Sequence, residues 1–107
     1  MLATTRPLLD IAVRRSPAGW QILVTGELDT ASGRDLITAT SSALAVDLAP
    51  VDLDLSGVTF TDTAGWRAVL DACRRATAGG AAARVVATSP AIDYLLAKRD
   101  LAQNAFP

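Results

Sequence analysis

This chain of 107 residues contains no histidine and a single cysteine. The absence of histidine excludes Ser-His-Asp and Cys-His catalysis, and it excludes metal sites built on imidazole ligands. Cys73 has no second cysteine with which to form a disulfide or a Cys-x-x-Cys site. Because it lies on an apolar helical stripe, we expect a small core residue rather than a reactive thiol. No metal site and no cofactor are expected.

Positive charge and long apolar runs are also scarce. Lys and Arg number 10 against 11 Asp and Glu, the net charge is −1, and Lys98 is the only lysine. Without a basic field, nucleic acid is not an expected partner. No stretch approaches the roughly 20 apolar residues of a membrane helix, and the start lacks an apolar run of signal-peptide length. We therefore expect a cytoplasmic protein that does not insert into membranes.

The composition that remains is that of a small folded domain. Half of the residues are hydrophobic, which argues against disorder. A chain of this length forms one domain by default. We expect residues 1–7 to be a flexible tail and residues 8–107 to form the domain.

Hydrophobic periodicity divides the domain into seven elements. Apolar residues alternate with polar ones over four predicted strands, and three predicted helices show apolar residues at helical spacing. The predicted strands cover residues 9–14, 20–25, 51–55 and 84–87. The order β-β-α-β-α-β-α, with helices between the later strands, predicts an α/β domain. Its sheet is expected to be mixed and four- to five-stranded, with the helices packed against it.

The most informative segment covers residues 51–65. Leucines alternate with aspartates at its start, and Ser56-Gly57 is predicted to end the strand. After Asp62-Thr63 the apolar spacing becomes helical, over about residues 63–78. Thr63 is therefore predicted to be the helix N-cap, with an accessible hydroxyl in a field that favours negative charge. Such a hydroxyl is well placed to carry a phosphate.

The other two helices also have recognisable starts. Ser32, with Asp35 three residues later, resembles a capping box, and residues 26–30 are predicted to be the loop before it. Ser89-Pro90 offers a cap and a proline at the first helical position. The cations expected in the last turn of that final helix are Lys98 and Arg99.

With these elements in order, the chain resembles the STAS family, the anti-sigma-factor-antagonist-like domains, from about Leu8 onward. The resemblance rests on four motifs in the family's order. They are Gly26-Glu27-Leu28-Asp29, the strand leading into Asp62-Thr63-Ala64-Gly65, Gly79-Gly80, and the Ser89-Pro90 helix with its Leu95-Leu96 pair.

The resemblance implies a non-enzymatic regulatory module. In that family the residue after the aspartate of the Asp62-Thr63-Ala64-Gly65 block is the phosphoacceptor, so the implied phosphorylation site is Thr63. Unphosphorylated antagonists bind a Ser/Thr kinase that also acts as an anti-sigma factor, and phosphorylation ends the binding until a phosphatase resets the cycle. The implied partner-binding residues are Asp29, Asp62, Thr63, Ala64 and Gly65.

The chain departs from the family pattern at several positions. Thr63 replaces the commoner serine, and Ala64 lacks a second hydroxyl. Trp66 stands where an aliphatic residue is usual, and Arg67 where a small one is common. These departures bear on the identity of the partner more than on the fold.

Three other functions remain open. Some small STAS proteins are non-enzymatic subunits of ABC-type lipid-transport complexes and bind an ATPase subunit through the same helix. A phosphoaspartate receiver or Mg²⁺ site would use Asp52, Asp54 and Asp62, but no acidic pair follows the first strand. An enzyme with Thr63 as nucleophile would lack a histidine base.

Several of these residues also have a purely structural interpretation. Thr63 can serve only as a helix cap, and Asp29 as a cap or turn residue rather than an ion-pair partner for a kinase. Trp66 is expected to be a core residue rather than an exposed anchor. The arginines expected to form a solvated helix face are Arg67, Arg74 and Arg75.

Overall fold

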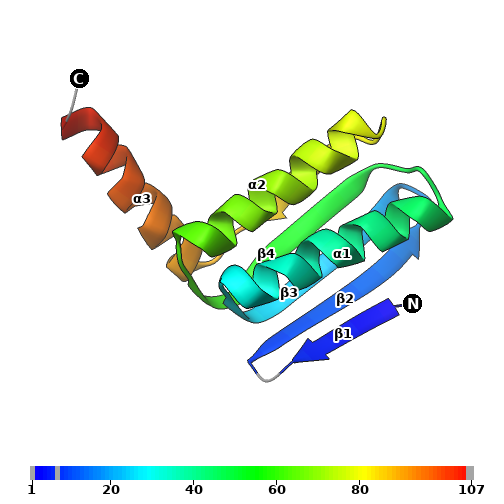
Figure 1. Ribbon diagram of the computed structural model, residues 1–107, viewed down its shortest axis with the longest axis horizontal. Coiled ribbons are helices and arrows are strands. Elements are labelled where there is room, and N and C mark those ends of the chain that lie inside the picture. The colour runs from blue at the N-terminus through cyan, green and yellow to red at the C-terminus, as the bar shows by residue number, and fades with distance from the viewer. Residues whose placement is uncertain (1, 7, 106–107) are drawn as a thin grey trace.

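The computed structural model describes the backbone of residues 2–6 and 8–105 and the side chains of residues 8–99. Its elements alternate in the way the periodicity predicts (Figure 1). They are β1 (Leu2–Arg6), β2 (Leu9–Ser16), β3 (Gly19–Leu28), α1 (Thr30–Val46), β4 (Val51–Thr61), α2 (Thr63–Ala78), β5 (Ala83–Ala87) and α3 (Pro90–Ala105).

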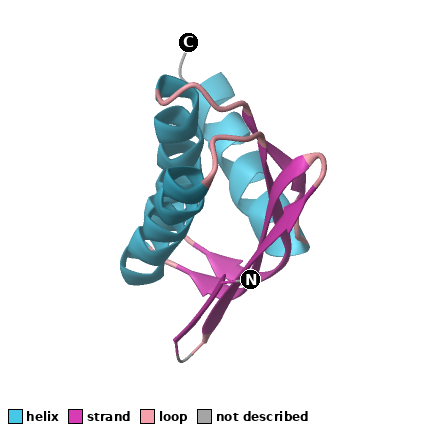
Figure 2. Cartoon of the chain, turned by 90° about the vertical axis from the view of Figure 1, so that its right-hand side faces the viewer, coloured by secondary structure: helices cyan, strands magenta, loops and turns pink. Residues whose placement is uncertain are grey.

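The strands form one mixed sheet in the order β1-β2-β3-β4-β5. β1, β2 and β3 pair antiparallel, whereas β3, β4 and β5 pair parallel. Parallel neighbours require crossover connections, and α1 and α2 provide them while lying side by side over the sheet (Figure 1). Figure 2 shows the twist of the sheet beside the helices. The predicted α/β class with a mixed sheet is confirmed.

The first strand corrects the expected tail at residues 1–7. β1 pairs antiparallel with β2, with Leu2 opposite Val13 and Arg6 opposite Leu9. Without β1, β2 would be an edge strand with a row of unpaired backbone N–H and C=O groups. The backbone of β1 satisfies these groups, and this pairing does not require alternating apolar side chains in β1. The predicted β-β-α-β-α-β-α order therefore holds from β2 onward, with one more strand before it. Residues 1 and 7 of the expected tail lie outside the described residues.

β3 and β4 both run further than predicted. β3 includes residues 26–28, which were expected to be loop, and β4 continues through Ser56-Gly57 to Thr61. The pairing between β3 and β4 shifts register at this point, so β4 absorbs an extra residue as a bulge. The carboxylate of Asp54 accepts hydrogen bonds from the Ser56 hydroxyl and backbone N–H, at 2.6 and 2.9 Å. A glycine inside a strand therefore marks a bulge here rather than a strand end.

The core lies between the sheet and its helices. Alternate residues of the central strands are buried, as half-buried strands require. Each helix contributes at least one fully buried aliphatic side chain to the same core. Examples from β2, β3, β4, α1, α2 and α3 are Ile11, Ile22, Leu53, Leu36, Val69 and Ile92.

α3 begins where predicted but ends later. The Ser89 hydroxyl accepts a hydrogen bond from the Ile92 N–H at 3.4 Å, and Pro90 is the first helical residue. The helix contacts β4 and then runs away from the sheet (Figure 1). Because it continues to Ala105, Lys98 and Arg99 lie within the helix and not in its last turn.

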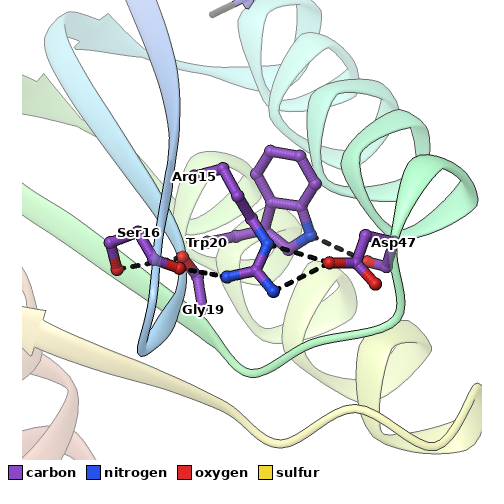
Figure 3. Close-up of polar contacts among 5 residues, drawn as sticks. All are labelled: Arg15, Ser16, Gly19, Trp20 and Asp47. Carbon is purple, nitrogen blue, oxygen red and sulfur yellow. Dashed lines mark hydrogen bonds and ion pairs between the residues drawn. The ribbon is translucent and has the colours of Figure 1, made fainter.

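A polar cluster joins the β2–β3 turn to the end of α1 (Figure 3). The Arg15 guanidinium donates to the Asp47 carboxylate through Nε at 2.9 Å and through Nη2 at 2.7 Å, and also to the Ser16 carbonyl. Its Cζ lies 5.6 Å from the centroid of the Trp20 ring. Trp20 Nε1 donates to the backbone carbonyl of Asp47, the α1 C-cap, at 2.8 Å. The cluster fixes the end of α1 against the hairpin.

Candidate functional site

The predicted site residues lie where β3 and β4 end and α1 and α2 begin. The parallel register places Leu28 opposite Thr61. Asp29 and Asp62 therefore follow at the same level of two neighbouring strands, and each is the N-cap of the next helix. The structure thus brings the two Asp-Thr pairs of the sequence to one edge of the sheet.

Asp62, and not Thr63, is the N-cap of α2. Its backbone is extended, and its Oδ1 accepts a hydrogen bond from the Gly65 N–H at 2.7 Å. The prediction for Thr63 was wrong by one residue, because aspartate and threonine are both good N-caps. Thr63 is instead the first helical residue, with an exposed side chain. No described residue hydrogen-bonds its hydroxyl.

Asp29 caps α1 through a reciprocal capping box. Its carboxylate accepts from the Ser32 N–H at 3.0 Å, and its own N–H donates to the Ser32 hydroxyl at 2.9 Å. Hydrogen bonds from the backbone and side chain of Ser32 hold the pKa of Asp29 below its usual 3.8. The predicted cap at Ser32 was therefore wrong, because Ser32 is the N3 residue of a box that begins at Asp29. The carboxylate of Asp29 thus has a structural role, while the side chain stays partly exposed.

Ala64 and Gly65 differ sharply in accessibility. Ala64 is half-buried and lines a shallow groove between α1 and α2 together with Thr30 and Arg67. Gly65 is buried, and a Cβ at this position would overlap the carbonyl oxygen of Leu28. Gly65 therefore allows α2 to start against β3 and offers no side chain to a partner.

A hollow of about 410 Å³ lies beside Thr63, between the end of β4, the start of α2 and α3. Phe60 and Tyr94 line it and are 48% and 65% exposed. Lys98 Nζ lies 5.0 Å from the centroid of the Tyr94 ring. These aromatic residues were not predicted as part of the site, because nothing in the periodicity places Phe60 and Tyr94 together. The one signal in the sequence was the scarcity of aromatic residues, which are 5% of the chain, so that each of them could have been considered as a site residue.

The remaining candidate residues lie away from the edge of the sheet where β3 and β4 end. Asp52 pairs with Arg84 at 3.0 Å, and Asp54 binds Ser56, so neither joins Asp62. Among the described residues, no three His, Cys, Asp or Glu side chains gather as metal ligands would. Trp66 is half-buried and packs against the core. In the same part of the chain, no helix has the length and hydrophobicity needed to span a bilayer.

The site thus offers an uncovered hydroxyl in the first turn of a helix, next to exposed aromatic side chains. The first backbone N–H groups of a helix have no partner within the helix and carry partial positive charge. A phosphate on this hydroxyl would meet those groups without unfolding the helix.

Comparisons with known proteins agree with this fold. Residues 11–103 match the family model described as "Mlab, STAS domain". No curated protein matches the chain. An anti-sigma factor antagonist from Mycobacterium paratuberculosis is similar in structure, with 22% identity, coverage of 90% of this chain and 81% of that one, and a TM-score of 0.67.

Two further solved structures are similar. The antisigma-factor antagonist STAS domain from Rhodobacter sphaeroides shows 24% identity, coverage of 82% and 91%, and a TM-score of 0.62. A structure described as "Crystal Structure Analysis of Mglu" shows 21% identity and a TM-score of 0.57, and the match spans 70% of this chain but 19% of that protein. At these identities the structural matches establish the fold alone. The family model covers most of the sequence, and the chain belongs to the STAS domain family.

Proposed function

We propose that this STAS domain is an anti-sigma factor antagonist that acts in the cytoplasm by switching partners. Its partner is a Ser/Thr kinase that also serves as an anti-sigma factor. The kinase phosphorylates Thr63 and is thereby released, and a phosphatase restores the unmodified hydroxyl. The observation that carries the proposal is the exposed Thr63 side chain at the start of α2, whose hydroxyl makes no hydrogen bond with a described residue.

The surface around Thr63 suits protein binding. Phe60 and Tyr94 expose aromatic area beside the hydroxyl, and aromatic residues are enriched at protein interfaces. The half-buried Ala64 faces the neighbouring groove between α1 and α2. A kinase that docks on the aromatic side chains would have the hydroxyl at the centre of the contact.

Phosphorylation would act on docking more than on folding. A phosphate adds roughly −1.5 to −2 charges near neutral pH. Within α2, the free N–H groups of the first turn stabilise that charge. A partner covering Thr63 would have to remove water from the phosphate, which is costly. The neighbouring Asp62 carboxylate adds charge of the same sign.

The test is phosphorylation by the cognate kinase with ATP, followed by intact-mass analysis. Thr30→Ala is a matched control, because Thr30 is also an exposed first helical residue that follows an aspartate cap. Wild type and Thr30→Ala should each gain one phosphate, and Thr63→Ala should gain none. A Thr63→Asp variant should bind the kinase more weakly than wild type. Equal labelling of Thr63→Ala would show that Thr63 is not the acceptor.

The family model favours a second candidate. Its description, Mlab, differs from that of the anti-sigma factor antagonists among the similar structures. In this second function the chain is a non-enzymatic STAS subunit of an ABC-type lipid-transport complex, and α2 binds the ATPase subunit. Co-purification with a tagged chain, with partners identified by mass spectrometry, separates the two functions. Recovery of a transporter ATPase in place of a kinase would support the second.

A further inference from the structure

A second hollow, of about 530 Å³, lies between α2 and α3. Its described lining contains three arginines, one leucine and the single cysteine, and no acidic residue. The lining residues are Arg67, Leu70, Cys73, Arg74 and Arg99. In a chain whose net charge is −1, this is a local concentration of positive charge. The sequence predicts that Arg67 and Arg74 lie on a solvated helix face, whereas the hollow that they share with Arg99 is a tertiary feature.

Two of the three arginines have no ion pair with another described residue. Arg74 Nη2 lies 2.8 Å from Asp71 Oδ1, and Arg75 Nε lies 2.9 Å from Asp71 Oδ2. The Asp71 carboxylate is therefore already shared by two cations. Arg67 and Arg99 have no such acceptor among the residues whose side chains are described, and we take their charges to be available to a ligand in the hollow.

The Arg99 guanidinium has one donor without an acceptor among the described residues. Its Nη1 atom is shielded from solvent and makes no hydrogen bond with any described residue. A shielded N–H without an acceptor is unfavourable. The planar guanidinium matches the two oxygens of a carboxylate. A carboxylate in the hollow would be a matching acceptor for the Arg99 guanidinium.

The floor of the hollow is apolar. Leu70 is 43% exposed there, and Cys73 is half-buried beside it. Burial raises the pKa of the Cys73 thiol, so the sulfur stays neutral. Aromatic side chains on which bases could stack are absent from the described lining. The hollow therefore combines cations with aliphatic surface, which suits an acidic side chain next to an apolar one.

The hollow is also continuous with the groove between α1 and α2, which lies beside the first turn of α2. Arg67 lines both this hollow and the groove that contains Ala64. A protein docked at the first turn of α2 would therefore reach the hollow along the same helix. This continuity favours a protein segment over a free anion as the occupant.

We infer that this hollow binds an acidic segment of a protein partner, with an Asp or Glu carboxylate between Arg67 and Arg99 and an aliphatic neighbour on Leu70. The inference rests on the proposed function in one respect: it assigns the acidic segment to the same partner that binds around Thr63. The charge and shape of the hollow do not depend on phosphorylation of Thr63.

The test is an NMR titration of the full chain with the acetylated peptide Glu-Glu-Leu-Leu-Glu-Glu. The Nε–Hε signals of Arg67 and Arg99 should shift, and Arg67→Gln or Arg99→Gln should weaken binding about tenfold, as loss of a charged hydrogen bond does. Arg75→Gln removes the same charge from the same helix but outside the hollow, and it should change affinity less than about twofold. Arg99→Lys should also weaken binding, because lysine keeps the charge but lacks the paired N–H donors of the guanidinium.

Several outcomes would overturn the inference. Equal weakening by Arg75→Gln would indicate non-specific charge attraction. Equal binding of Gln-Gln-Leu-Leu-Gln-Gln would show that the carboxylates are not recognised. The acidic peptide could also fail to bind while inorganic phosphate or phosphatidylglycerol vesicles bind through Arg99. That result would show that the ligand of the hollow is another anion and not a protein segment. Because no kinase is present, these outcomes are independent of whether Thr63 is phosphorylated.

Discussion

Asp29 and Asp62 occupy equivalent positions on two neighbouring parallel strands. Each follows one member of the register pair Leu28–Thr61, and each accepts a hydrogen bond from the backbone N–H three residues later. Two helix N-termini therefore start side by side, each followed by an exposed threonine. The local geometry of Thr30 and Thr63 is alike, so a kinase that modifies only Thr63 must recognise what surrounds it. The hollow with Phe60 and Tyr94 is present at Thr63.

The first prediction tests which residue caps α2. Asp62→Ala should lower the free energy of unfolding by about 1 kcal/mol, because the Gly65 N–H loses its acceptor. Thr63→Ala should change it by less than about 0.5 kcal/mol, since exposed substitutions away from a cap have small effects. Urea unfolding of both variants provides the measurement. A larger loss for Thr63→Ala would return the capping role to Thr63.

A second prediction separates docking from folding. Thr63→Glu places negative charge in the first turn of α2 and should leave stability unchanged or raise it by up to about 0.5 kcal/mol. Thr77→Glu places the same charge at an exposed position in the last turn and should lower stability by a similar amount. Thermal unfolding at low ionic strength compares them. Marked destabilisation by Thr63→Glu would mean that phosphorylation acts by unfolding the helix.

The third prediction concerns acid stability. Hydrogen bonds from the side chain and backbone of Ser56 lower the pKa of Asp54, and those from Ser32 lower the pKa of Asp29. Because the folded pKa values lie below the unfolded ones, the unfolded chain binds more protons in acid. The stabilisation is therefore complete above about pH 5 and is lost as the pH falls below about 4.

Urea unfolding between pH 3 and pH 6 tests this dependence. Ser56→Ala removes the largest cause of the Asp54 shift and should make the loss of stability in acid less steep. Ser42→Ala, at an exposed position of α1, should keep the wild-type slope. A slope that Ser56→Ala does not change would show that Asp54 contributes nothing to it.

The fourth prediction compares Gly65, in the first turn of α2, with Gly79, the C-cap of the same helix. Gly65→Ala should destabilise the fold by more than about 2 kcal/mol, because the Cβ would overlap Leu28 and lie 2.7 Å from Thr61 Oγ1. Gly79→Ala should be nearly neutral, since its φ is −83° and its nearest new neighbour would be 3.4 Å away. Denaturant unfolding of the two variants tests this, and equal effects would contradict the close approach of α2 to β3.

A fifth prediction concerns the cluster in Figure 3. Trp20→Phe should cost about 1 kcal/mol, because the bond from Nε1 to the Asp47 carbonyl is lost in a buried setting. Asp47→Ala keeps that carbonyl and removes only an exposed ion pair with Arg15, so it should cost less than about 1 kcal/mol. Thermal unfolding distinguishes them. A greater loss of stability for Asp47→Ala would show that the ion pair contributes more than the bond from Trp20 Nε1.

Local patterns in the sequence were sufficient for the order of elements and for several of their boundaries. α2 extends over Thr63–Ala78 as its apolar spacing indicates, and α3 starts at Pro90 behind its Ser89 cap. The motifs around Asp62 and Thr63 also identified the STAS family. These features follow from periodicity and from residues adjacent in the chain, so no knowledge of distant contacts is needed to find them.

The tertiary structure alone decided where strands continue, which residue caps each helix and which side chains meet. β4 passes through Ser56-Gly57 because β3 offers it hydrogen bonds across a bulge. Gly65 is buried because Leu28, far away in sequence, lies against it. Phe60 and Tyr94 line one hollow because α3 packs against β4, and Arg67 and Arg99 line another in the space between α2 and α3. Such contacts depend on the register and packing of elements that are distant in the chain, and local sequence patterns carry no record of them.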